Sequence, residues 1–174
     1  MAIKNLKFKL HRLAVLIVIA CISHYVSSAP QLPEPELSWK NVAVDGKKTA
    51  VFSLFNDSRG IMWLGTNRGL YFYDGVTTHS VGENELFGTQ IYSIVEKDNS
   101  LFLGSNNGLL VYDYSTGTVK HHPSTNPKEI RSLLLADDGL WIGSLNGVFR
   151  LNLSNNELTD LSSGLPNNSV YPLL

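Results

Sequence analysis

One segment of the sequence occurs three times at a fixed interval of 39 residues, and this repeat constrains the fold more than any other feature of the chain. Each copy contains an apolar run centred on an aromatic residue, then a glycine, a threonine or serine, and a second glycine. The copies span residues 61–74, 100–113 and 139–152. A period of about 40 residues built from short β-type runs is typical of propeller blades with four strands each. The sequence therefore predicts an all-β fold made of β-propeller blades.

The sequence predicts three complete four-stranded antiparallel blades, at about 50–81, 90–122 and 130–161. The second strand of each blade is apolar at consecutive positions, which is the pattern of a strand buried on both faces. We therefore expect the aromatic residues at the centre of these strands, Trp63, Phe102 and Trp141, to be buried in equivalent positions. The glycine after each run has no side chain, so a neighbouring blade or strand is expected to come close there.

A short hairpin joins the second predicted strand of each repeat to the third. Its residues are the pairs Arg68-Gly69, Asn107-Gly108 and Asn146-Gly147. Asn-Gly is the preferred pair of a type I′ turn because both central residues have positive φ. The sequence thus predicts type I′ turns, with Arg68 as the residue that departs from the preference.

Partial strands flank the three repeats. Residues 37–42 are predicted to form an outer strand of a preceding or closing blade. Residues 169–174 begin a fourth repeat, because Val170 lies 40 residues after Ile130. Propellers contain about four to eight blades, so three blades and partial strands do not close a ring. We interpret residues 37–174 as a partial β-propeller, an incomplete ring at the N-terminal end of a longer protein.

Residues 1–28 are typical of a signal peptide. Four basic residues within the first twelve precede an apolar run at 13–22, and small residues follow at 27–29. The run is shorter than the about 20 residues that a membrane-spanning helix needs. We expect export to the periplasm and a mature chain that starts near Ala29, with an extended proline-rich leader at 29–36. Cys21 leaves a second interpretation open, in which it is the lipidated cysteine of a lipoprotein.

The expected mature chain is acidic and has no cysteine. Cleavage after Ser28 leaves ten basic and fifteen acidic residues, a net charge of −5. This balance argues against nucleic-acid binding, which needs a basic surface. A mature chain without cysteine cannot form disulfides, so an exported domain must rely on its apolar core.

The repeated motif, Leu-Trp-Ile-Gly-Ser/Thr-x-x-Gly-Leu/Val after an Asp-rich turn, resembles the two-component regulator propeller repeat over about residues 37–174. The second repeat departs from it, since its turn at 98–100 lacks glycine and Phe102 replaces tryptophan. In that family such repeats form the exported sensor propellers of hybrid two-component histidine kinases of Bacteroidetes, followed by a membrane helix that anchors the protein in the inner membrane. The resemblance implies an oligosaccharide or glycan ligand, and partner domains further along the same longer protein. Kinase activity would reside in those domains and not in this segment.

No catalytic motif is present, so we predict no catalytic residue, no metal site and no cofactor in this segment. His121 and His122 are adjacent on an outer strand, where neighbouring side chains point to opposite faces, and we expect both to be solvated. Asp137 and Asp138 raise the alternative of a calcium site, but a turn between two strands accounts for both.

Any ligand is expected at the rim formed by the second-to-third-strand hairpins and the loops 82–90, 123–129 and 162–169. The candidate ligand-binding residues on this rim are Asn67, Arg68, Asn106, Asn107 and Asn146. Their amide and guanidinium groups suit hydroxyl-rich ligands. Each asparagine is equally well explained as a turn-former.

Two functions from different classes remain open. The first is a ligand-sensing or interaction propeller that catalyses nothing, the periplasmic input region of a signalling histidine kinase. The second is the N-terminal part of an exported propeller enzyme, such as a glycan lyase or hydrolase. The residues leave open whether the protein forms a homodimer.

Overall fold

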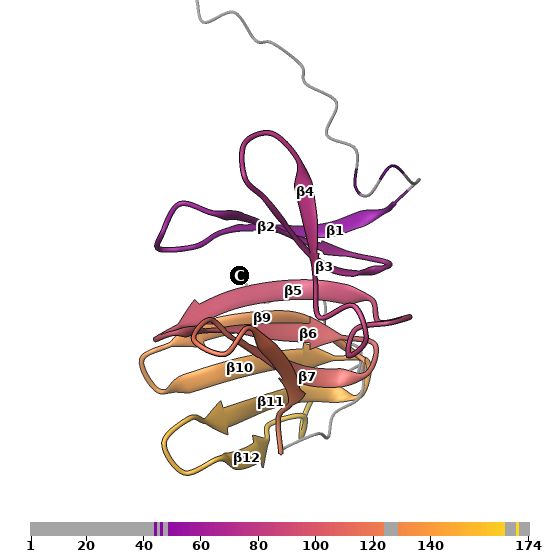
Figure 1. The fold of residues 1–174 in the computed structure, drawn as a ribbon. Helices are drawn as coiled ribbons and strands as arrows, with labels where there is room; N and C mark the ends of the chain where they lie inside the picture. The colour runs from indigo at the N-terminus through magenta and orange to yellow at the C-terminus, as the bar shows by residue number, and fades with distance from the viewer. Residues whose placement is uncertain (1–43, 45, 47–48, 124–128, 166–169, 171–174) are drawn as a thin grey trace, which may run out of the picture. The chain divides into compact units, whose positions relative to one another are not determined.

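The computed structural model describes residues 44, 46, 49–123, 129–165 and 170, all within the unit Asn41–Leu174. These residues form three four-stranded antiparallel sheets (Figure 1). The first sheet contains β1 (Val51–Asn56), β2 (Met62–Thr66), β3 (Gly69–Tyr73) and β4 (Thr78–Val81). The second contains β5 (Ile91–Lys97), β6 (Ser100–Ser105), β7 (Gly108–Asp113) and β8 (Thr118–His121). The third contains β9 (Ile130–Ala136), β10 (Gly139–Ser144), β11 (Gly147–Asn152) and β12 (Glu157–Asp160).

Several predicted segments lie outside the described residues. They are the signal peptide at 1–28, the leader at 29–36, the outer strand at 37–42 and all of 169–174 except Val170. In the part of the chain that is described, no helix has the length and apolar character needed to cross a membrane.

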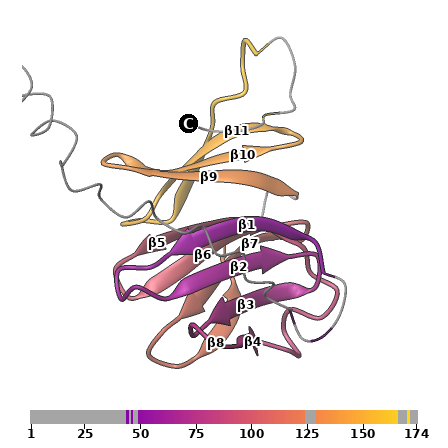
Figure 2. The same ribbon diagram turned by 90° about the horizontal axis from the view of Figure 1, so that it is seen from above.

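Successive sheets pack face to face through two apolar clusters. The cluster between the first and second sheets consists of Trp63, Leu70, Val81, Leu86, Ile91, Ile94, Leu101, Leu103, Leu110 and Val119. The cluster between the second and third sheets consists of Leu109, Ile130, Leu133, Leu140, Ile142 and Leu151. The first strands of the sheets also follow one another, since β1 contacts β5 and β5 contacts β9 (Figure 2). The predicted fold class is therefore confirmed: three consecutive propeller blades, which form no closed ring within the described residues.

The glycine after the apolar run lets the next blade come close, as expected from the sequence. A Cβ atom on Gly65 would lie 2.2 Å from the hydroxyl oxygen of Ser53 in the same sheet and 2.8 Å from the carbonyl oxygen of Ile91, the first residue of β5. A Cβ atom on Gly104 would lie 2.8 Å from Cγ2 of Ile130, the first residue of β9. Any larger residue here would push the next blade away, so the glycine sets the spacing between blades.

The prediction of type I′ hairpins is wrong. Thr66 pairs with Gly69, so the two central residues of the first hairpin are Asn67 and Arg68. Neither has positive φ; the left-handed conformation is adopted by Gly69, with φ of 107°. A type I turn followed by a glycine bulge has this pattern. Arg68 therefore carries no unfavourable backbone conformation.

A buried hydroxyl explains this choice of turn. Thr66 Oγ1 donates to the carbonyl oxygen of Gly69 at 2.8 Å and accepts from the N–H of Arg68 at 3.0 Å. Ser105 and Ser144 make the same two bonds in the other blades. All three hydroxyl residues are fully buried. Because the hydroxyl binds the backbone from inside the sheet, it holds a turn that an Asn-Gly pair alone would not select.

The predicted burial of the three central aromatic residues is correct only for the first. Trp63 is 2% exposed and lies between Phe72 of its own sheet and Tyr112 and Tyr114 of the second, with ring centroids 5.3–6.1 Å apart. Phe102 and Trp141 are only partly buried. Phe102 has a smaller ring and packs at the edge of the second cluster. Trp141 shares its face of the third sheet with Leu134 and Arg150, and no other described sheet covers that face.

Candidate functional site

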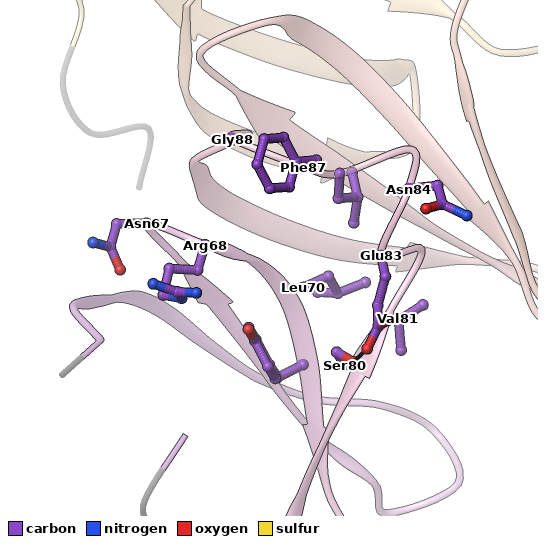
Figure 3. Close-up of a pocket in the computed structure, with 11 residues that line it drawn as sticks. Asn67, Arg68, Leu70, Ser80, Val81, Glu83, Asn84, Phe87 and Gly88 are labelled. Atoms are coloured by element: carbon purple, nitrogen blue, oxygen red, sulfur yellow. Dashed lines mark hydrogen bonds between the residues drawn. The ribbon is translucent and has the colours of Figure 1, made fainter. Parts of the chain in front are cut away.

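A hollow of about 570 Å³ opens at the rim of the first blade (Figure 3). It is formed by the β2–β3 hairpin, the adjoining parts of β3 and β4, and the loop from β4 to β5. The lining residues are Asn67, Arg68, Leu70, Tyr71, Ser80, Val81, Glu83, Asn84, Leu86, Phe87 and Gly88. This is the rim on which the sequence analysis placed the ligand.

The loop from β4 to β5 is held by one buried apolar side chain. Leu86 is 2% exposed and belongs to the cluster between the first and second sheets. Its N–H donates to the carbonyl oxygen of Gly82 at 2.7 Å, and the N–H of Thr89 donates to the carbonyl oxygen of Leu86 at 3.0 Å. A Cβ atom on Gly69 would lie 3.3 Å from Cβ of Leu86, so the hairpin glycine leaves room for the loop to cross it. The loop is thus fixed to the blade core.

Polar groups of opposite charge line the hollow. Arg68 is exposed, and its guanidinium has no carboxylate partner among the residues that the structure describes. Glu83 is also exposed and accepts a hydrogen bond from the hydroxyl of Ser80. Figure 3 shows Arg68 and Glu83 on opposite sides of the hollow, with Phe87 between and above them. The hollow is therefore lined by the hydrogen-bond donors of Arg68, the carboxylate acceptor of Glu83 and the aromatic ring of Phe87.

Of the five candidate rim residues, the structure brings only Asn67 and Arg68 to this hollow. Asn106, Asn107 and Asn146 are exposed on the equivalent hairpins of the second and third blades and do not line it. Asn67 also has a structural role, since its Oδ1 accepts from the N–H of Ala50 at 3.0 Å. Asn106 Oδ1 accepts in the same way from the N–H of Gln90 at 2.9 Å. These two amides therefore tie the hairpin to the residue before the first strand of the same blade.

Sequence reasoning identified the loop 82–90 but singled out none of its residues. Phe87 is 91% exposed, and it lines the hollow together with Glu83 and Asn84. The signal in the sequence is a large aromatic residue inside a loop rich in glycine and polar residues. Phe87 differs from the other exposed apolar side chains of the described surface in that it lines this hollow together with polar groups.

A second polar cluster lies at the opposite end of the strands, in the turn between β1 and β2. The buried carboxylate of Asp57 accepts from the indole Nε1 of Trp63 at 2.9 Å and from Arg59 at 2.6 Å. Tyr114 of the second blade donates to the same carboxylate at 3.3 Å. Burial by itself would raise the pKa of Asp57, but the hydrogen bonds from Trp63, Arg59 and the N–H of Ile61 lower it to about 2.

This cluster joins the first blade to the second. The guanidinium of Arg59 lies 3.6 Å from the ring centroid of Tyr114. The single hydroxyl proton of Tyr114 is shared with Glu96 of β5, whose Oε1 lies 3.1 Å from the phenol oxygen, and Ser58 donates to Glu96 through both its N–H and its hydroxyl. Burial and the negative charges of Glu96 and Asp57 raise the pKa of Tyr114, so the phenol stays protonated and keeps donating. These contacts connect the first blade to the second, and we call the cluster of Asp57, Ser58, Arg59, Glu96 and Tyr114 the clamp.

The expectation that both neighbouring histidines are solvated is wrong for His122. His121 is exposed, whereas His122 is 8% exposed and lies 6.4 Å from the ring of Phe102. Burial lowers the pKa of His122 and favours its neutral form. His122 lies one residue beyond β8, where its N–H donates to the carbonyl oxygen of Leu109 at 2.9 Å and its ring contacts that of Phe102.

In the third blade, Asp138 makes the same kinds of hydrogen bond to a tryptophan indole and an arginine that Asp57 makes in the first. Its carboxylate accepts from the indole Nε1 of Trp141 at 3.0 Å and from Arg150 at 3.2 Å. The described residues contain no group of three or more histidine, cysteine, aspartate or glutamate side chains that could hold a metal ion.

Comparisons with known proteins agree with the resemblance inferred from the repeats. The family model of the two component regulator propeller matches residues 45–68. The extracellular domain of BT4673 from B. thetaiotaomicron, described as a one component system, is 34% identical with a TM-score of 0.72, over 78% of this chain and 19% of that one. A second structure of that domain, described as part of a hybrid two component system, is 34% identical with a TM-score of 0.70, over 76% and 19%. No curated protein matches the sequence.

The extracellular domain of BT3049 from the same organism, described as part of a hybrid two component system, has the same fold. Its identity is 23% and its TM-score is 0.60, over 72% of this chain and 19% of that one. The chain therefore spans about a fifth of the length of these solved relatives. The resemblance is confirmed: residues 45–68 match the two component regulator propeller model, and the chain is similar to the extracellular domains of such systems.

Proposed function

We propose that this chain, which carries two component regulator propeller repeats, is an extracytoplasmic input region of a signalling histidine kinase, and that it recognises oligosaccharides without catalysing a reaction. The observation that carries the proposal is the 34% identity to the extracellular domain of BT4673 over 78% of the chain. That protein is described as a one component system and as a hybrid two component system, both of which are signalling systems. Export through residues 1–28 would place the blades in the periplasm.

The chemistry of the hollow supports an oligosaccharide as the ligand. Sugar hydroxyls both donate and accept, so they need neighbouring donors and acceptors on the protein. Arg68 and the amides of Asn67 and Asn84 supply donors, and Glu83 supplies an acceptor. The blades present these groups on a rim outside the apolar core, which is the usual arrangement of a recognition loop on a rigid scaffold.

Calorimetry of the full chain against pools of oligosaccharides tests this proposal, with chromatographic analysis of the same pools after incubation. We expect heat of binding from at least one pool and no change in the composition of any pool. Cleavage of a pool by purified protein would favour the alternative of an exported lyase or hydrolase. Absence of binding to every pool would contradict oligosaccharide recognition.

A further inference from the structure

Phe87 is the large apolar side chain that stands out most on the described surface. It is 91% exposed, more than any other large hydrophobic residue that the structure describes. Covering the ring would remove its apolar surface from water, which favours binding of a ligand that stacks on it. Its position in the lining of a hollow indicates a small ligand.

The ring is presented by a fixed loop. The preceding residue, Leu86, is buried between the first and second blades, and backbone hydrogen bonds close the loop on both sides of it. With Leu86 directed into the core, the next side chain is directed outward. A binding group held in place before the ligand arrives loses little conformational freedom on binding.

The charges around the ring favour a neutral ligand. Arg68 and Glu83 stand on opposite sides of the hollow (Figure 3), so one positive and one negative group face the same space. A ring bearing hydroxyl groups can accept from the guanidinium on one side and donate to the carboxylate on the other. A ligand with its own carboxylate would gain from Arg68 but would be repelled by Glu83.

We propose that Phe87 is the stacking platform of a subsite for one neutral sugar ring, with Arg68 and Glu83 bonding its hydroxyl groups. The C–H face of a pyranose carries a slight positive charge and is attracted to the negative face of an aromatic ring. An aromatic surface with a few convergent polar groups is the general composition of small-molecule sites. This inference rests on the proposed recognition of oligosaccharides and names the residue and ligand class within it.

The test is isothermal titration of the full chain with neutral tetrasaccharides of glucose, xylose, galactose and mannose, and with a tetragalacturonide of the same length. Phe87→Ala is expected to weaken binding of the preferred neutral sugar by about tenfold or more, as loss of a central aromatic contact does. Phe87→Tyr keeps the ring and should bind within about threefold of the wild type. Val76→Ala is the matched control, because Val76 is 73% exposed in the β3–β4 turn and lies outside the hollow. Both positions are exposed, so these variants are expected to fold.

Three outcomes would overturn the subsite while leaving the proposed function standing. These are an unchanged affinity in Phe87→Ala, tighter binding of the tetragalacturonide than of every neutral sugar, and an equal loss in Val76→Ala. A Phe87→Ala protein that binds sugar normally but changes its mass in light scattering would assign Phe87 to a protein contact. Failure of the wild type to bind any of the sugars would overturn the proposed function, and the subsite with it.

Discussion

The substitution Asp57→Asn is expected to reduce the free energy of unfolding by about 2 kcal/mol at neutral pH. The side chain of Asp57 is fully buried, and its two oxygens accept from Trp63 and Arg59 and from the backbone N–H groups of Arg59 and Ile61. Asparagine has one carbonyl oxygen and one amide group. Whichever way the amide is placed, its N–H groups face donors, and the charge that pairs with Arg59 is lost.

The magnitude follows from the ionisation of the carboxylate. Its pKa falls from 3.8 to about 2 in the folded protein, which corresponds to about 2 kcal/mol of stability. Because the folded pKa is below the unfolded one, this contribution is complete above about pH 4 and is lost as the pH falls toward 2. Asparagine does not ionise, so the difference between wild type and variant should shrink over that same interval.

The assay is urea unfolding of the full chain followed by tryptophan fluorescence, at pH 7 and at steps down to pH 2.5. Glu85→Gln, at an exposed position of the β4–β5 loop, is the charge-matched control and should change stability by less than about 0.5 kcal/mol. Two results would refute the reasoning. One is an Asp57→Asn protein as stable as the wild type at pH 7, and the other is a stability difference that stays constant down to pH 2.5.

Five further substitutions can be measured by the same unfolding assay. Gly65→Ala places a Cβ atom 2.8 Å from a backbone oxygen of the next blade and should cost about 3 kcal/mol. Gly60→Ala, at φ of 83° in open space, is the control and should cost about 1 kcal/mol. Equal losses of stability would contradict the role of Gly65 in the spacing between blades. Trp63→Ala should cost about 3–5 kcal/mol and Trp141→Ala clearly less, because only the ring of Trp63 is enclosed. A larger loss for Trp141→Ala would show that the burial of these two rings is wrongly assigned. Ser105→Ala removes a buried hydroxyl that bonds the hairpin N–H of Asn107 and should cost about 1–2 kcal/mol; unchanged stability would show that the hydroxyl does not stabilise the turn.

The blades could be predicted because their signals are local and repeated. The interval of 39 residues, the apolar runs and the paired glycines all lie within single blades, and three copies reinforce one another. The role of Gly65 could be inferred because a missing side chain in a buried strand has few explanations. The hairpin type was missed for a reason that is also local: a Ser or Thr hydroxyl before the turn competes with the preference of Asn-Gly.

The sequence predicted which rim carries the candidate site, but not all of the side chains that line it. The topology of a blade puts hairpins and β4–β5 loops on one rim, which identified Asn67 and Arg68. The outward position of Phe87 depends on Leu86 entering the core between two blades, and this contact is tertiary. The clamp was missed likewise, since Asp57 reads as an ordinary turn residue until Tyr114, 57 positions later, is brought beside it.

The turns at the two ends of the first blade are stabilised by different groups, and this difference bears on where ligand preference can vary. At the β1–β2 end, side chains carry the connection, because Asp57 and Arg59 contact Tyr114 of the second blade and Ser58 donates to Glu96 of that blade. At the hairpin end, the buried Thr66 hydroxyl closes the turn, so Arg68 contributes only its backbone N–H to the fold. A side chain that the fold does not use can change without loss of stability. The hairpin end is therefore where ligand preference can vary while the spacing and packing of the blades stay the same.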